Sequence, residues 1–223
     1  MDRHLRDSEL YEERYGYKES RSSVRFYVAI LLIFVCLLGF RAFWVQNFGG
    51  VQVDGSSMKQ TLLNEEMLLM KYVKDSDDLK HGDVIVVHVE HYPEYILQNT
   101  GKLPENQTRY LIKRLIAMEG DRVRCTDGQV EICYAGTSAW VELDEPYAYY
   151  TDKEGYDFSE YTVGRGEVFF LGDNRNNSKD SRYKEGGGST LQKLYLESDI
   201  TGVVPQWAID KKELLKKILF RQF

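Results

Sequence analysis

The amino-acid sequence predicts a mainly β protein, with an antiparallel β-sheet domain behind a single N-terminal transmembrane helix. The first observation is an uncharged apolar run over residues 26–40, close to the N-terminus of the 223-residue chain. The second is a series of short apolar or alternating segments after residue 46, bounded by Gly, Asp and Asn, which is typical of strands. The third is Asp127-Gly128 between two such segments, which indicates a hairpin turn. The length fits one folded domain with an appendage.

Residues 26–45 are expected to form the transmembrane helix, because about 20 largely apolar residues are needed to cross a bilayer. Arg41 is the one charge in this stretch and lies near its end, where a long side chain can reach the interface. A buried helix of a soluble protein is disfavoured, since the run is apolar all round. A cleaved secretory signal is disfavoured too, because residues 1–25 are long and mixed in charge and no small-x-small site follows the apolar core.

The basic residues around this segment predict its direction. Lys18, Arg21 and Arg25 precede it closely, whereas the next basic residue after Arg41 is Lys59. By the positive-inside rule, the N-terminus then lies in the cytoplasm. We therefore expect a single-pass protein of the cell membrane with a cytoplasmic tail (1–25), a signal-anchor helix (26–45) and an extracytoplasmic domain (46–223).

The external domain reads mostly as strand, which favours an antiparallel β domain over alternating βαβ units. The expected strands, with a hairpin in the fourth segment, cover residues 67–73, 83–89, 109–118, 122–133 and 166–171. Long loops are expected over residues 91–108, 147–161 and 184–189. The net charge of −6 argues against a general nucleic-acid binder, so no nucleic-acid partner is expected.

The C-terminal stretch, about residues 207–220, is expected to form an amphipathic helix. Leu214, Leu215, Ile218 and Leu219 fall on one face, with lysines around it. Two interpretations stay open at this point. The helix packs against the domain, or it contacts an anionic membrane surface.

The cysteines and histidines carry weaker signals. Cys36 lies inside the apolar run and is expected to be inert. A two-residue turn would place Cys125 opposite Val130 rather than Cys133, but two external cysteines so close in sequence tend to pair, and we expect a disulfide. His88 and His91 are too few for a convincing metal site, so a solvated loop is favoured there.

Three sequence motifs, called boxes below, contain the candidate catalytic residues: GSSMKQTL (55–62), YLIKRLIAMEGD (110–121) and GDNRNNSKDSR (172–182). In the second box Lys113 interrupts an apolar strand, and a lysine in a buried strand must be paired, solvated or neutral. Burial lowers a lysine pKa from about 10.4 towards about 7–8. A neutral amine can then take the proton of a serine hydroxyl, which activates the serine as a nucleophile.

Together with the apolar segment and HGDVIVV (81–87), these boxes stand in the order found in bacterial type I signal peptidases. The chain resembles these membrane-bound Ser/Lys endopeptidases, which remove signal peptides from exported preproteins through an acyl-enzyme. The resemblance runs from the apolar segment to about Gly202. It implies the bilayer and exported preproteins as partners, and neither a metal nor another cofactor. It leaves the oligomeric state open.

The resemblance implies Ser57 as the nucleophile, rather than Ser56, and Lys113 as the general base. In the third box it implies that Ser181 orients the base and that Asp180 and Arg182 form a structural ion pair. The supporting residues implied in full are Met58, Arg114, Asp173, Asn174, Asp180, Ser181 and Arg182.

Two positions in the first box differ from residues found there in members of the family. Gly55 offers no hydroxyl, so the backbone N–H of Ser57 is expected to bind the oxyanion. Gln60 replaces the family's usual proline, which would fix φ, and its presence is expected to loosen the site. The alternatives are a catalytically weakened, membrane-anchored peptide-binding paralogue and a self-cleaving Ser/Lys regulator. The apolar anchor disfavours the second.

Overall fold

The computed structural model describes residues 21–74, 79–88, 110–182 and 195–219. The chain divides into two compact units, residues 1–46 and 47–223. In the first unit, α2 (Arg21–Asn47) contains an apolar stretch, Val24–Asn47, that is long enough to cross a membrane. Its 24 residues span about 36 Å at 1.5 Å per residue. The predicted helix is therefore present, with bounds slightly wider than residues 26–45.

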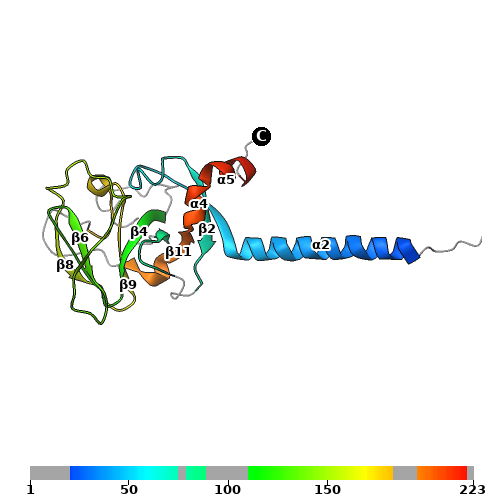
Figure 1. Ribbon diagram of the computed structural model, residues 1–223, viewed down its shortest axis with the longest axis horizontal. Coiled ribbons are helices and arrows are strands. Elements are labelled where there is room, and N and C mark those ends of the chain that lie inside the picture. The colour runs from blue at the N-terminus through cyan, green and yellow to red at the C-terminus, as the bar shows by residue number, and fades with distance from the viewer. Residues whose placement is uncertain (1–20, 75–78, 89–109, 183–194, 220–223) are drawn as a thin grey trace, which may run out of the picture. The chain divides into compact units, whose positions relative to one another are not determined.

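The second unit is built on a seven-stranded antiparallel sheet (Figure 1). Its strands, in spatial order, are β1 (Phe48–Gln52), β2 (Met67–Tyr72), β11 (Ile200–Val204), β3 (Val84–His88), β4 (Tyr110–Met118), β9 (Glu167–Leu171) and β10 (Tyr195–Leu196). Each hydrogen-bonded pair in this sheet is antiparallel. The fold is thus mainly β, as predicted.

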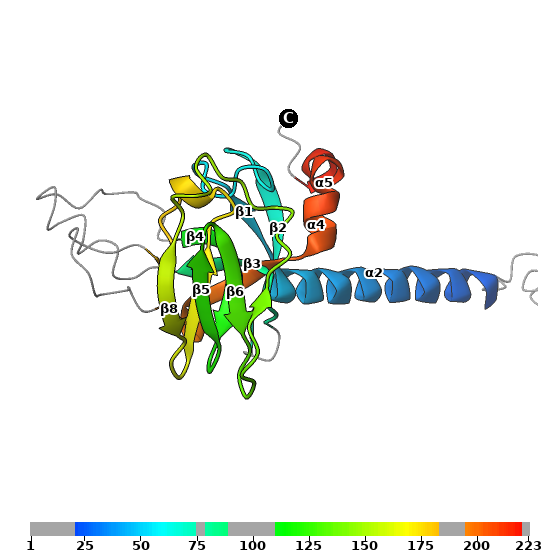
Figure 2. The same cartoon turned by 60° about the vertical axis from the view of Figure 1, so that its left-hand side comes forward.

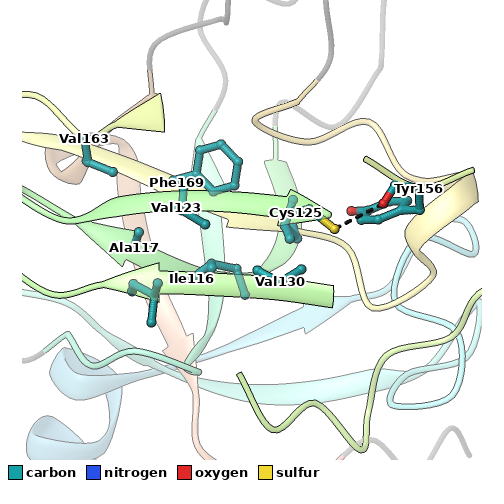
Figure 3. Packing of buried hydrophobic residues seen from close by; sticks show 10 residues of the cluster. Ile116, Ala117, Val123, Cys125, Val130, Tyr156, Val163 and Phe169 are labelled. Atoms are coloured by element: carbon teal, nitrogen blue, oxygen red, sulfur yellow. Dashed lines mark hydrogen bonds between the residues drawn. The ribbon is translucent and has the colours of Figure 1, made fainter. Parts of the chain in front are cut away.

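A second, four-stranded antiparallel sheet follows β4 through a tight turn (Figure 2). Its order is β7 (Val141–Glu142), β6 (Gln129–Cys133), β5 (Arg122–Thr126) and β8 (Phe158–Thr162). Figure 3 shows side chains of both sheets meeting in one core, among them Ala117 and Phe169 of the first sheet and Val123 and Val130 of the second.

The central strands β4 and β9 are buried on both faces. Successive side chains of a strand point to opposite sides. Ile116 and Phe169 enter the core shared with the second sheet, whereas Leu115 and Phe170 enter another cluster on the opposite face. This double burial explains why β4 reads as a nearly continuous apolar run, and it leaves Lys113 in an apolar environment.

The β5–β6 hairpin confirms the predicted turn and contradicts the predicted disulfide. Cys125 lies opposite Val130, and both Asp127 and Gly128 have positive φ, as a two-residue type I′ turn requires. Cys133 instead lies opposite Arg122, which precedes Cys125 by three residues on β5. An odd offset places the two cysteines on opposite faces of the sheet, so both thiols are free and buried.

The five predicted strand segments are all present, but others were missed. The sequence did not predict β1, β11 or the short β7 and β10, and β8 begins inside a stretch expected to be a loop. The expected C-terminal helix is two pieces, α4 (Gln206–Asp210) and α5 (Lys212–Leu219). The expected loops 91–108 and 184–189, and His91, lie outside the described residues. Within the described ranges, no group of three metal-ligating side chains occurs.

Candidate active site

The first box forms a closed loop between β1 and β2. Backbone hydrogen bonds at its neck join Val53 to Glu66 and Glu65, at 2.9 and 2.8 Å. Met58 and Leu62 are buried, with 1% and 0% of their surface exposed, and the Leu62 N–H donates to the Met58 carbonyl at 2.8 Å. The two apolar anchors fix the turn that carries the neighbouring Ser57.

The third box follows β9 and binds this loop from the other side. The Asn174 backbone N–H donates to the Ser57 carbonyl, and its side-chain amide donates to the Ser56 carbonyl, both at 2.9 Å. A Cβ added at Gly172 would lie only 2.6 Å from the Ser57 carbonyl oxygen, so a glycine is required at this close approach. Ser56 Oγ accepts from the Asn177 amide at 3.1 Å, which leaves Ser57 as the serine that faces β4.

Ser57 and Lys113 lie in direct contact, as predicted. Lys113 Nζ is 2.7 Å from Ser57 Oγ and 2.9 Å from the Ile112 carbonyl, and the lysine is only 2% exposed. Burial lowers the pKa of Lys113 to about 8, although the carboxylates of Asp180 and Asp173 counteract this shift. The geometry therefore places an amine that can be neutral near physiological pH beside a serine hydroxyl.

Arg114, the next residue of β4, holds the carboxylate of Asp173. Its guanidinium makes two hydrogen bonds to Asp173, of 2.8 and 2.6 Å, and a third to the Gly82 carbonyl at 2.8 Å. The guanidinium also lies 3.7 Å from the centroid of the Tyr147 ring. Thr61, from the nucleophile loop, donates its hydroxyl to the same carboxylate. Asp173, a residue of the third box, thus links β4 to Thr61 of the first box.

The predicted ion pair between Asp180 and Arg182 is present, at 3.0 Å. Asp180 also accepts from the Gly172 N–H at 3.1 Å, and Arg182 donates to the Arg175 carbonyl at 2.8 Å. The pair therefore folds the end of the third box back onto its beginning, close to Ser57.

The expected hydrogen bond between Ser181 and Lys113 is not formed within the described residues. Ser181 Oγ instead accepts from the Phe170 N–H at 3.0 Å, and the Ser181 N–H donates to the Phe170 carbonyl at 3.1 Å. Ser181 therefore continues the hydrogen bonding of β9 rather than orienting the amine.

Ser178 is a residue that sequence reasoning missed. Its Oγ is buried and has no hydrogen-bond partner within the described part of the chain. A Cβ added at Gly172 would meet this Oγ as well as the Ser57 carbonyl, so Ser178 packs beside the nucleophile's backbone. The signal in the sequence was a second serine in the same polar box.

A second missed feature is the buried ion pair between Arg175 and Glu145. Arg175 has no exposed surface, and its guanidinium donates to Glu145 and, at 2.8 Å, to the Tyr150 hydroxyl. Tyr149 adds backbone hydrogen bonds to Asp173 and Arg175, of 2.7 and 2.9 Å. The segment before β8 is thereby fixed against the third box, although Glu145 lies far from that box in the sequence.

A groove with a cavity volume of about 410 Å³ includes Ser57 and Lys113 in its lining. Residues 50–53 line one side and residues 110–113 line the other. Among the described strands, β1 pairs only with β2, and β4 begins to pair with β9 only at Arg114. Both sides of the groove are therefore strand edges with backbone groups available for an extended peptide.

Gln60 lies within the nucleophile loop in a backbone conformation that proline cannot adopt. Its φ is +88°, whereas proline fixes φ near −65°. A non-glycine residue in this region costs on the order of 1–3 kcal/mol. The backbone of this loop would therefore have to change to accept the family's proline at position 60.

We predict that Gln60→Gly raises the free energy of unfolding by about 1 kcal/mol, because glycine adopts positive φ without steric cost. Gln60→Pro should lower the unfolding temperature, because it forces the loop to move. Thermal unfolding of the full chain checks both variants, with Gln60→Ala as the control that keeps the strain. A more stable Gln60→Pro variant would contradict the assigned turn.

Comparisons with known proteins identify the family of the chain. Residues 23–209 match the family described as signal peptidase, peptidase S26. Signal peptidase I P of Bacillus subtilis subsp. natto is 30% identical over 184 residues, which cover 78% of this chain and 83% of the relative. Signal peptidase I T of Bacillus subtilis (strain 168) is 29% identical over 179 residues, covering 76% and 80%.

A crystal structure of a signal peptidase I from Enterococcus faecalis V583 aligns with 60% of this chain and 99% of its own, at 23% identity and a TM-score of 0.39. The family match and the identity to the Bacillus relatives carry the assignment. The chain belongs to the signal peptidase family, peptidase S26, and is a serine peptidase of the class that cleaves signal peptides.

Proposed function

We propose that the chain cleaves signal peptides from exported preproteins with Ser57 as nucleophile and Lys113 as general base. The observation that carries this proposal is the 2.7 Å contact between Ser57 Oγ and the buried Lys113 Nζ. The neutral amine takes the hydroxyl proton while Oγ attacks the scissile carbonyl, and the ammonium then protonates the leaving amine. Water, activated by the same amine, hydrolyses the acyl-enzyme ester.

The oxyanion of each tetrahedral intermediate is assigned to the backbone N–H of Ser57. Gly55 supplies no hydroxyl, and its own N–H donates to Asn64 at 2.7 Å. A backbone donor needs no reorganisation, because the loop is already held by Asn174 and by its buried anchors.

The substrate is assigned to the groove between β1 and β4. An extended peptide can pair its backbone with the edges of both strands, and side chains then enter the groove alternately. The family's preference for small residues at the first and third positions before the cut is carried over to this groove as part of the proposal.

The membrane location follows from α2 and from the flanking charges. The apolar stretch Val24–Asn47 is assigned as the membrane anchor, with the N-terminal tail in the cytoplasm and the β domain on the outer side. An enzyme and a substrate held on one membrane meet at a raised effective concentration.

Replacing either dyad residue should abolish cleavage. We expect Ser57→Ala and Lys113→Met to lower kcat by at least about 10³-fold, because the first removes the nucleophile and the second the base. Ser56→Ala is the matched control and should retain most activity, since Ser56 Oγ contacts only Asn177 among the described side chains. The measurement is cleavage of a preprotein by the purified full chain.

Equal turnover by the wild-type chain and Ser57→Ala would refute the dyad. A folded wild-type chain that binds preproteins without cleaving them would instead identify a peptide-binding paralogue.

The cleavage rate should rise with pH and reach half its maximum near pH 8. The active form is the neutral amine, and burial lowers the pKa of Lys113 to about 8, so protonation inactivates the enzyme below that pH. Asp180→Asn should move the midpoint to lower pH, because the Asp180 carboxylate favours the charged amine. A pH–rate profile of kcat/KM checks both shifts, and a profile that falls through this range would contradict a lysine base.

We propose further that Ser178, rather than Ser181, orients the Lys113 amine once substrate is bound, because its buried Oγ lies beside the Ser57 backbone and has no hydrogen-bond partner within the described residues. Ser178→Ala should lower kcat and change the pH midpoint while leaving the unfolding temperature nearly unchanged, because its Oγ makes no hydrogen bond within the described structure. Ser181→Ala should destabilise the fold by about 1–3 kcal/mol, because the buried Phe170 N–H loses its acceptor. Parallel melting curves and pH–rate profiles separate the two roles, and the reverse pattern would restore the role to Ser181.

A further inference from the structure

The nucleophile loop, residues 53–66, contains two non-glycine residues with positive φ. Gln60 has a φ of +88° and Glu65 has a φ of +66°. Such conformations are costly for residues with a Cβ, and they persist only where surrounding contacts hold them. The stretch between the two positions, residues 61–64, therefore depends on contacts that fix its backbone.

Lys212, the first residue of α5, supplies such contacts. Its Nζ donates to the Thr61 carbonyl at 3.2 Å and lies 2.9 and 3.0 Å from the two carboxylate oxygens of Glu66. Glu66 in turn accepts from the Leu63 N–H at 2.8 Å. One ammonium group thus binds the residue that follows each of the two strained positions.

The packing of α5 keeps Lys212 in this place. Both α4 and α5 pack against β2, with Leu215 half-buried, which is the first of the two arrangements expected for this stretch from the sequence (Figure 2). The side chain of Lys212 is only 24% exposed, whereas the nearby Lys211 and Lys216 are exposed. The family match ends at residue 209, so Lys212 lies outside the matched segment.

Thr61 connects Lys212 to the nucleophile. The Thr61 N–H donates to the carbonyl of Met58 at 3.1 Å, and Met58 is the buried anchor next to Ser57. A shift of the Thr61 peptide would therefore move the turn that carries the nucleophile.

Thr61 also connects Lys212 to the base. The Thr61 hydroxyl donates to the carboxylate of Asp173, which Arg114 binds from the position next to Lys113 on β4. Both members of the dyad are therefore linked to the residue whose carbonyl Lys212 holds.

We propose that Lys212 is a positioning residue, which binds the Thr61 carbonyl and so holds the nucleophile loop in the conformation that brings Ser57 to Lys113. This rests on the proposed function of these two residues as a dyad. Neither Thr61 nor Lys212 belongs to the described residues that line the groove. Loss of the Lys212 ammonium should therefore lower kcat and leave KM nearly unchanged, because it misplaces the reacting groups without removing a peptide contact.

The test measures kcat and KM for preprotein cleavage by the purified full chain, together with a melting curve of each variant. Lys212→Met should lower kcat by about tenfold and change KM by less than about twofold, because methionine keeps the packing but cannot donate. Lys212→Arg should restore most of kcat, since a guanidinium can donate to both acceptors. Lys211→Met is the matched control at an exposed lysine and should leave both constants unchanged.

A second variant separates the bond to Thr61 from the ion pair. Glu66→Gln removes the negative charge but keeps an oxygen that can accept from Leu63 and Lys212. Positioning through Thr61 requires that this variant lose much less kcat than Lys212→Met. An equal loss in the two variants would assign the effect to the ion pair and refute the proposal.

The remaining outcomes separate this inference from the proposed function. Unchanged kcat in Lys212→Met, while the wild-type chain cleaves preproteins, refutes positioning and leaves the proposed function intact. A loss of kcat that Lys212→Arg does not restore, or that the melting curve attributes to unfolded chain, marks a purely structural role and refutes positioning too. Equal turnover by the wild-type chain and Ser57→Ala refutes the dyad, and positioning with it.

Discussion

Desolvation of one amine is the constraint on which the rest of the structure depends. Lys113 occupies a central strand whose neighbours are apolar on both faces, so its charged form is poorly solvated and its pKa is lowered. An amine in water would be protonated at neutral pH and could not act as a base. The double burial of β4 is therefore part of the chemistry as well as of the core, and no histidine is required beside Ser57.

Uncompensated carboxylates beside Lys113 would raise its pKa and so cancel the lowering that burial causes. Asp173 is held by Arg114 and Asp180 by Arg182, so each carboxylate near the amine has a paired arginine, and the two carboxylates raise the pKa of Lys113 less than its burial lowers it. Removing one partner of such a buried pair costs more than the pair contributes, because the remaining charge stays desolvated. The ion pairs therefore act mainly by fixing the positions of the two carboxylates and the electrostatic potential around Lys113.

The sequence contained the local features of the site but few of the long-range ones. The strand around Lys113 and the Asp127-Gly128 turn could be predicted because each depends on neighbours in the chain, whereas the Asp180–Arg182 pair was implied by the family resemblance. The disulfide was wrong because the strand register, not proximity in sequence, decides which side chains share a face. The role given to Ser181 depended on which of two nearby serines completes the β9 hydrogen bonding, and only the folded loop decides that. Glu145 could not be paired with Arg175 from a stretch without periodicity.

In the proposed binding mode, the two open strand edges would recognise an extended substrate through its backbone. A groove bounded by β1 and β4 offers backbone hydrogen bonds that only an extended segment can satisfy, so a helical or folded stretch of substrate is excluded. Because Ser57 follows β1 closely and Lys113 belongs to β4, the proposed pairing of a peptide with both edges would bring its backbone to the Ser57–Lys113 pair, so that binding and alignment would be one event.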